Sequence, residues 1–280
     1  YKRLQGAITE ENLLTEQDFP TAKCFAKVFE FLDNNRMEDD WFVQLECFDP
    51  HEPFVAPERF KAAYDTGYNG KILNWPLYEK NTNSPEEIAV IRGNYAALVA
   101  MCDEYFGKLL DYFDQHSLWS DTSLILTTDH GFLLSEHDWW AKNRMPMYNE
   151  IAHIPLFIYH PDYKQYVGES RSAVTQNIDL MPTFLAMNNL NIPKEVKGKS
   201  LLDLLKKDSN IYTALYGYWG GGINITDGSY TYFHYPDNFD QTSQDKYQYT
   251  LMPTHMRQFF SNEELRTIKI QEPFSFTKDI

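Results

Sequence analysis

A long, regular pattern of apolar positions predicts a helix from Pro85 to about Gln115. Ser84 is a favoured N-cap residue, proline suits the first helical position, and the two acidic residues that follow complement the positive end of the helix dipole. One apolar stripe then recurs every three or four residues: Ile88, Ile91, Tyr95, Leu98, Cys102, Tyr105, Leu109 and Tyr112. We expect this stripe to pack against a core.

Three short apolar runs predict strands. WFVQLECF (41–48) is aromatic and β-branched, whereas SLILTT (123–128) and HIPLFIYH (153–160) are continuous apolar runs, typical of strands that are covered on both faces. TQNIDLMPTFLAM (175–187) predicts a short helix. Because strands alternate with helices, we expect residues 1–205 to form an α/β layered domain.

The pattern changes after about residue 206. The chain then alternates apolar and polar residues, is rich in Tyr and Thr, and places Asp227-Gly228 between two strand-like runs, which favours a β-hairpin. We expect residues 206–280 to form a smaller antiparallel subdomain. A helix near residues 262–268, capped by Ser261, would close it.

Composition limits the possible partners. The chain has 280 residues, of which 43% are hydrophobic and 16% aromatic, so it can build a substantial core. Its net charge of −15 argues against a nucleic-acid partner, which would require a basic face. No apolar run approaches the ~20 residues that span a bilayer, so we expect no membrane partner. The chain begins at Tyr1 without a signal-like segment, and its localisation and oligomeric state stay open.

Two of the predicted strands end in side chains that bind metals or anions. The first is followed by Asp49 and His51, and the second by Asp129 and His130. In open α/β sheets, ligands bind beyond the carboxyl ends of strands, so neighbouring strands would bring these groups together. Asp129 offers a hard oxygen and His130 a nitrogen, which suits a divalent cation such as Ca²⁺, Mg²⁺ or Mn²⁺. Gly131 would permit a sharp turn beside the ligand.

A cation follows in the next loop. Lys142 comes after Trp139 and Trp140, whose rings would partly exclude water and strengthen the attraction between an ammonium group and an anion. A cation, a metal ion and a histidine around one point form a receptor for a tetrahedral oxyanion, which would stabilise the charge of a group in transfer.

Each of these residues also has an ordinary structural explanation. Asp129-His130 after a strand is a common turn, His51 in a proline-rich loop suits a hydrogen-bonded surface residue, and Lys142 suits an exposed lysine. Glu136 and His137 fit either an outer layer of the site or a loop hydrogen-bond network. Only their occurrence together favours a functional site.

Six segments of the chain form one pattern, in this order: FDPHEPFVAPERF, IRGNYAALVAMCDEYFGKLLDYF, LILTTDHGFLLSEHDWWAKN, EIAHIPLFIYHP, TQNIDLMPTFLAM and KGKSLLDLL. Together they resemble the sulfatase family of the alkaline phosphatase superfamily, over about residues 20–235. The resemblance implies an alkaline phosphatase-like mixed sheet with helices on both faces, here in part, besides the small C-terminal antiparallel sheet with its helix.

The resemblance also implies roles for matching residues. Asp129 and His130 correspond to metal ligands, with His130 standing where many members have Asn. Lys142 matches the lysine that contacts the sulfate group, and His51 matches a histidine that contacts the same group and assists the leaving oxygen. Ser135 replaces a glycine that is usual in the family, so we expect a small change in loop geometry.

The family's nucleophile is a formylglycine made from a Cys/Ser-x-Pro/Ala-x-Arg motif, which none of Cys24, Cys47 and Cys102 begins. The early paired aspartates that complete the family's metal site are also missing. We therefore expect the chain to be the C-terminal part of a sulfatase-like enzyme. On its own it should bind metal poorly and show no formylglycine-dependent turnover.

Three functions follow as hypotheses. The first is a sulfuric ester hydrolase with a divalent ion, Ca²⁺ being the best candidate, acting on a small-molecule or glycan sulfate ester. His51 and Lys142 would be catalytic, and Trp139 and Trp140 would help to bind the substrate. The second is a phosphonate or phosphate monoester hydrolase of the same superfamily. The third is a non-catalytic binding or structural module.

Overall fold

The computed structural model describes residues 11–208, 213–217, 222–235, 247–250 and 274–277, and the chain divides into two units, Tyr1–Tyr212 and Thr213–Ile280. The assignment of residues 1–205 to an α/β domain and of residues 206–280 to a small antiparallel subdomain stays a prediction. None of the helices in the described ranges has both the length and the hydropathy that crossing a bilayer requires.

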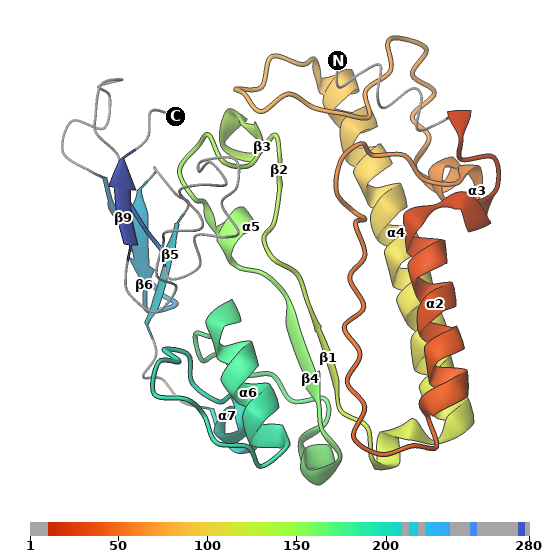
Figure 1. The fold of residues 1–280 in the computed structure, drawn as a ribbon. Coiled ribbons are helices and arrows are strands. Elements are labelled where there is room, and N and C mark those ends of the chain that lie inside the picture. Colours follow the sequence, from red (N-terminus) through yellow and green to blue (C-terminus); the bar gives the residue numbers. More distant parts are fainter. Residues whose placement is uncertain (1–10, 209–212, 218–221, 236–246, 251–273, 278–280) are drawn as a thin grey trace. The chain divides into compact units, whose positions relative to one another are not determined.

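Among the described residues, helices come before the first strand, helices and strands mix in the middle of the chain, and strands follow in the second unit (Figure 1). The α-helices are α2 (Pro20–Asn35), α3 (Glu58–Lys61), α4 (Pro85–His116), α5 (Asn149–Ala152), α6 (Leu180–Met187) and α7 (Leu202–Lys206). The strands are β1 (Leu124–Thr127), β2 (Leu133–Leu134), β3 (Trp140–Ala141), β4 (Leu156–Tyr159), β5 (Ala214–Gly217), β6 (Ile223–Thr226), β7 (Thr231–His234), β8 (Tyr247–Thr250) and β9 (Phe274–Thr277). Short 3-10 turns connect several of them, at Glu16–Asp18, Ala62–Tyr64, Leu118–Ser120, Glu136–Asp138, Pro161–Tyr166 and Asn177–Asp179.

Helix α4 confirms the prediction from the apolar stripe. Ser84 caps it through a hydrogen bond from the backbone N–H of Glu87, and the Glu87 side chain accepts from the backbone N–H of Ser84. This capping box satisfies two donors that the first turn would otherwise leave unpaired. The helix ends at Ser117, which takes a left-handed conformation (φ 57°).

Helix α2 is an element that the sequence analysis did not assign. Its signal was present: Pro20 stands at the first helical position, and Phe25, Val28 and Leu32 follow at helical spacing and are buried. Figure 1 shows α2 alongside α4, and the Phe25 ring packs 5.6 Å from that of Tyr105 on α4. These two helices form most of the main hydrophobic core.

The strands predicted at 123–128 and 153–160 are confirmed, but the prediction that both of their faces are buried is wrong. β1 and β4 pair with each other in antiparallel register, Leu124 opposite Tyr159 and Thr127 opposite Leu156. Their residues are mostly half-buried, and the Phe157 side chain is 64% exposed. Within the described residues, β1 and β4 form a two-stranded sheet. A strand is buried on both faces where helices cover both sides of a larger sheet, and a two-stranded sheet does not provide that cover.

Segment 41–48 was predicted as a strand, and no strand is assigned there. Burial still alternates along it, with Trp41, Val43, Leu45 and Cys47 packed against the core and the intervening residues exposed. The pattern therefore reported the buried face correctly. A strand also requires a hydrogen-bonded neighbour, and the described residues place none beside this segment.

In the second unit, β5, β6 and β7 form a three-stranded antiparallel sheet, which confirms the predicted hairpin. The Asp227 carboxylate accepts hydrogen bonds from the backbone N–H groups of Ser229 and Tyr230, and Gly228 takes a positive φ of 90°. β8 pairs with β9. The helix predicted at 262–268, with its cap Ser261, lies outside the described residues.

The burial of one face of α4 in the core of the first unit predicts how substitutions in this helix change stability. Leu98 is fully buried, so we expect Leu98→Ala to lower the free energy of unfolding by about 2–5 kcal/mol in urea denaturation of the whole chain. Val99 is the adjacent, exposed position, and Val99→Ala should change stability by about 0.5 kcal/mol or less. Equal losses in the two variants would contradict the burial of this helix face.

Candidate active site

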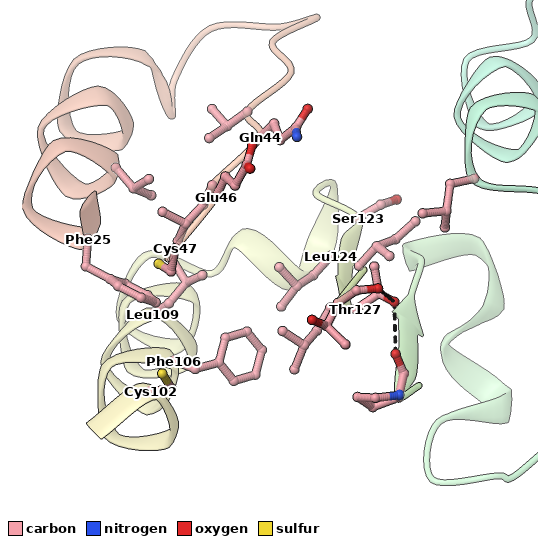
Figure 2. Close-up of a pocket in the computed structure, with 18 of the residues that line it drawn as sticks. Phe25, Gln44, Glu46, Cys47, Cys102, Phe106, Leu109, Ser123, Leu124 and Thr127 are labelled. Carbon is pink, nitrogen blue, oxygen red and sulfur yellow. Dashed lines mark hydrogen bonds between the residues drawn. The ribbon is translucent and has the colours of Figure 1, made fainter. Parts of the chain in front are cut away.

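The candidate site lines an open cavity of about 1990 Å³ in the first unit. Figure 2 shows part of its lining, with Phe25, Cys47 and Leu109 on one side and residues of β1, among them Leu124 and Thr127, on the other. The polar candidates all line it as well: Asp49, His51, Asp129, His130 and Lys142. The structure therefore brings these residues to one cavity from two separate parts of the sequence.

Asp49 is held by a residue of α2. The Thr21 hydroxyl, fully buried, donates to the Asp49 carboxylate across 2.6 Å. Burial raises the pKa of Asp49, and the hydrogen bond from Thr21 partly opposes that increase. Asp49 thus ties the loop that carries His51 to helix α2.

His51 and Lys142 converge on a carboxylate that the sequence analysis did not single out. The His51 Nδ1 lies 3.3 Å from Glu52 Oε2, and the Lys142 ammonium lies 4.0 Å from the same oxygen. The other oxygen, Glu52 Oε1, accepts a short hydrogen bond from the Tyr78 hydroxyl. Burial, followed by this hydrogen bond, raises the pKa of Tyr78. The available sequence signal was an acidic residue directly beside the candidate histidine.

Lys142 is buried, with 6% of its surface exposed, contrary to the ordinary view of it as a surface lysine. It follows the β2–β3 hairpin, which is held in place by hydrogen bonds to residues outside the hairpin. The Arg92 guanidinium on α4 donates to the backbone carbonyl of Leu134, and the backbone N–H of Trp140 donates to the carbonyl of Glu79. Several non-glycine residues of this loop have left-handed backbone conformations, namely Ser135, His137, Asp138, Ala141 and Asn143.

Ser135 bears on one specific expectation. Its φ is 79°, a value that glycine adopts more readily than serine, and the family resemblance expects glycine at this position. The Arg92 guanidinium donates a 2.9 Å hydrogen bond to the Ser135 hydroxyl. The loop therefore reaches a glycine-like conformation with a serine whose side chain has a partner.

Asp129 and His130, the predicted metal ligands, contact each other and line the cavity. The Asp129 side chain is 79% exposed, and its Oδ2 lies 3.3 Å from the His130 Nε2. Asp129 Oδ1 also accepts from the backbone N–H of His130, the turn contact expected on local grounds. Among the described residues no three His, Cys, Asp or Glu side chains gather closely enough to hold an ion. Ca²⁺ takes six to eight oxygen ligands, so the present residues fit one side of such a site and do not complete it.

The tryptophans pack beside the loop. Trp140 is almost fully buried in the core, its indole N–H donates to the Asn81 side chain, and neither it nor Trp139 lines the cavity. Trp139 is half-buried beneath the Lys80 ammonium. Their predicted contact with a substrate stays a prediction.

Glu136 and His137 stabilise the same loop. Glu136 accepts a hydrogen bond from the backbone N–H of Leu134, and His137 stacks on Tyr148 and pairs with Glu150. These contacts favour the loop-network explanation of the two residues.

Two thiols near the cavity are poorly suited to nucleophilic chemistry. Burial raises the pKa of Cys47 and of Cys102 to about 12, so both are protonated at neutral pH. A protonated thiol is a weak nucleophile, which agrees with the absence of the family motif around these cysteines.

The comparisons with known proteins identify the family. The model of the sulfatase family matches residues 10–190, well over half of the chain, and a model described as N-sulphoglucosamine sulphohydrolase, C-terminal, matches residues 135–270. The chain therefore belongs to the sulfatase family, which confirms the resemblance found in its motifs.

Two curated relatives are sulfatases. The chain is 35% identical over 115 residues to an N-acetylglucosamine-6-O-sulfatase of Bacteroides thetaiotaomicron, covering 41% of this chain and 20% of that protein. It is 36% identical over 136 residues to arylsulfatase K of Xenopus laevis, covering 48% and 25%. The matches thus span about a fifth to a quarter of the length of these two relatives.

Solved structures support the fold. A protein crystallised with D-glucosamine-2-N,6-O-disulfate, its substrate, matches with a TM-score of 0.64 at 18% identity, over 78% of this chain and 61% of that one. A phosphonate monoester hydrolase of Agrobacterium radiobacter matches with a TM-score of 0.65 at 17% identity, over 79% and 53%. These likenesses confirm the alkaline phosphatase-like α/β fold class.

The Thr21–Asp49 contact predicts different outcomes for two substitutions. Asp49→Ala leaves the buried Thr21 hydroxyl without its acceptor and should lower the free energy of unfolding by about 1–3 kcal/mol. Asp49→Asn keeps an acceptor. The raised pKa of Asp49 means that its ionisation costs stability as pH rises above the unfolded-state value, and Asn removes that cost. At pH 7, Asp49→Asn should therefore stay within about 1 kcal/mol of the wild type. Equal losses would show that the charge, rather than the hydrogen bond, holds the loop.

Gly131 predicts a second pair. A Cβ at this position would lie 1.9 Å from the Glu150 carbonyl oxygen, so the backbone leaves no space for a side chain. Gly131→Ala should destabilise the protein by about 1–3 kcal/mol in urea denaturation. Gly107 in α4 has no neighbouring atom within 4 Å, and Gly107→Ala should stabilise by about 0.5–1 kcal/mol. Destabilisation by Gly107→Ala would contradict the open space at α4.

Proposed function

We propose that this chain forms part of a sulfuric ester hydrolase and supplies its anion-binding residues. The observation that carries the proposal is the convergence of His51 and Lys142 on Glu52 at the edge of a cavity that Asp129 and His130 also line. The family membership and the names of the sulfatase relatives support the same function.

The residues have complementary roles in such a reaction. Hydrolysis of a sulfate ester breaks the bond between sulfur and the bridging oxygen, and negative charge develops on that oxygen and on the sulfate group. The Lys142 ammonium would stabilise the sulfate oxygens, and His51 would donate a proton to the departing oxygen. Both residues act from a partly enclosed cavity, where water screens these interactions less.

A divalent ion would add to this charge stabilisation. Asp129 and His130 would provide one carboxylate and one imidazole towards it, with Ca²⁺ the best candidate and Mg²⁺ or Mn²⁺ the alternatives. When bound, such an ion stabilises negative charge on the sulfate oxygens. The formylglycine nucleophile expected for the family does not come from any of the three cysteines, so the residues of this chain bind the anion and protonate the leaving group.

The substrate class we favour is a sulfate ester of a sugar or of another small alcohol or phenol. The relative from Bacteroides thetaiotaomicron is named for a sulfated N-acetylglucosamine, and one structural neighbour holds a glucosamine disulfate. The acidic chain, with a net charge of −15, does not favour a nucleic-acid substrate.

The second candidate is a phosphonate or phosphate monoester hydrolase. The specific observation in its favour is the fold shared with a phosphonate monoester hydrolase. Lysine and histidine would bind the two non-bridging oxygens of a phosphonate monoester, or the three of a phosphate monoester, in the same way as the three of a sulfate ester. A non-catalytic module is the third candidate, and it predicts no turnover of either ester in any form of the protein.

The deciding experiment compares rates on an aryl sulfate and an aryl phosphonate, in a protein that carries this chain together with a formylglycine-bearing segment. We expect higher kcat/KM on the sulfate. Lys142→Ala and His51→Ala should each lower it by about 10²–10³-fold, because each removes a group that stabilises developing charge. Lys164→Ala, at an exposed lysine, is the matched control and should leave the rate unchanged. A preference for phosphonate would reject the sulfatase proposal in favour of the second candidate.

A further inference from the structure

Glu52 is a charged residue in an unusual environment. Only 2% of its surface is exposed, and carboxylates are almost never buried to this degree unless they are paired. Its Oε1 has the Tyr78 hydroxyl as a hydrogen-bond donor, but its Oε2 has no hydrogen-bond partner. Oε2 instead lies 3.3 Å from the His51 Nδ1 and 4.0 Å from the Lys142 ammonium.

Neither contact of Glu52 Oε2, with His51 or with Lys142, is a close hydrogen bond. A charge-assisted hydrogen bond between an ammonium and a carboxylate is about 2.7–2.9 Å long, whereas Lys142 Nζ stands 4.0 Å from Glu52 Oε2. Lysine has three N–H donors, so this separation keeps Lys142 near the carboxylate while leaving its donors available to a second anion. The Glu52 carboxylate thus fixes the position of Lys142, and the Lys142 N–H groups can still bind the anion of a ligand.

The backbone of Glu52 orients the histidine. His51 Nδ1 lies 2.6 Å from the Glu52 carbonyl oxygen, which assigns the Nδ1 proton to that contact. The Nε2 atom, on the far side of the ring, is then the nitrogen that meets a ligand. One residue thus sets the direction of the histidine through its carbonyl and the position of the lysine through its carboxylate.

Aromatic rings enclose the cluster and strengthen its electrostatics. The Lys142 ammonium lies 5.9 Å from the centre of the Phe132 ring, and Phe132 makes edge-on contacts with Phe54 and Tyr78. Phe54 is 1% exposed. Because these rings exclude water, the attraction between the Glu52 carboxylate and the Lys142 ammonium is screened less than it would be at the surface.

We infer that Glu52 is a positioning residue that holds His51 and Lys142 in a fixed arrangement for an anionic ester. This inference rests on the proposed function for its catalytic part, since Glu52 acts through the two residues that would touch the ester. The alternative is a purely structural role, in which Glu52 only neutralises a buried lysine so that the loop can fold.

The first test is kinetic, on the same formylglycine-bearing protein. Glu52→Gln preserves shape but replaces the charge, and it places an amide where Lys142 needs an anion. We expect kcat on the aryl sulfate to fall by about 10–100-fold, the range typical of groups that orient active-site residues, with a smaller change in KM. Glu52→Asp retains the charge and should recover part of the lost kcat. Glu58→Gln makes the same chemical change at an exposed position and should leave kcat unchanged.

The second test does not depend on turnover. We would acylate the 280-residue chain with acetic anhydride and measure each lysine by mass spectrometry. Glu52→Gln should raise the labelling of Lys142 at least severalfold relative to Lys108, because Lys142 loses its counter-charge while Lys108 keeps its 3.0 Å pair with Glu104. Glu52→Asp should give an intermediate ratio. Thermal unfolding of each variant shows whether it is folded.

The outcomes separate the two proposals. Unchanged labelling in both Glu52 variants overturns the inference, whatever the activity. A kcat within twofold of the wild type in a folded Glu52→Gln protein assigns Glu52 the structural role and also overturns it. A wild-type protein that hydrolyses neither ester rejects the proposed function and the catalytic part of the inference with it, while the labelling still decides whether Glu52 holds Lys142.

Discussion

A buried lysine needs an anion nearby to offset the loss of its hydration, and the position of Lys142 depends on that requirement. The Glu52 carboxylate lies 4.0 Å from the Lys142 ammonium group inside the protein. Glu52 belongs to the loop after residue 48 and Lys142 to the loop after β3, so a single ion pair connects two distant parts of the sequence. The convergence of the candidate site follows from this pairing more than from any strand.

Local signals were enough to predict the long helix and the hairpin. Helix α4 is specified by its cap, its first-turn proline and its apolar stripe, and the β6–β7 turn by Asp227 and Gly228, all within a few residues of one another. Contacts between distant segments were not predictable in this way. The sequence alone does not show that Asp49 accepts a hydrogen bond from Thr21, or that Gly131 lies against the backbone carbonyl of Glu150.

Segment 41–48 is a second case in which a local pattern did not predict a contact with a distant segment. Its alternating burial is what a strand needs on one face, and the sequence predicted that correctly. Strand formation also needs backbone hydrogen bonds to a neighbour, a property of the whole sheet that no single segment encodes. The same holds for the predicted metal ligands: Asp129 and His130 can be recognised one by one as candidates, but a coordination shell depends on how many other donors reach the same point.

The loop that carries Lys142 explains how its position can be set before an anion arrives. Ser135, Ala141 and other residues of this loop hold left-handed backbone conformations, which cost energy for side chains other than glycine and persist only where surrounding contacts impose them. Arg92 and the backbone of Glu79 impose them here. An ammonium group held in place by such a loop needs little rearrangement when charge develops nearby. Fixed electrostatic groups of this kind stabilise a transition state more effectively than mobile ones, because the cost of orienting them was met during folding.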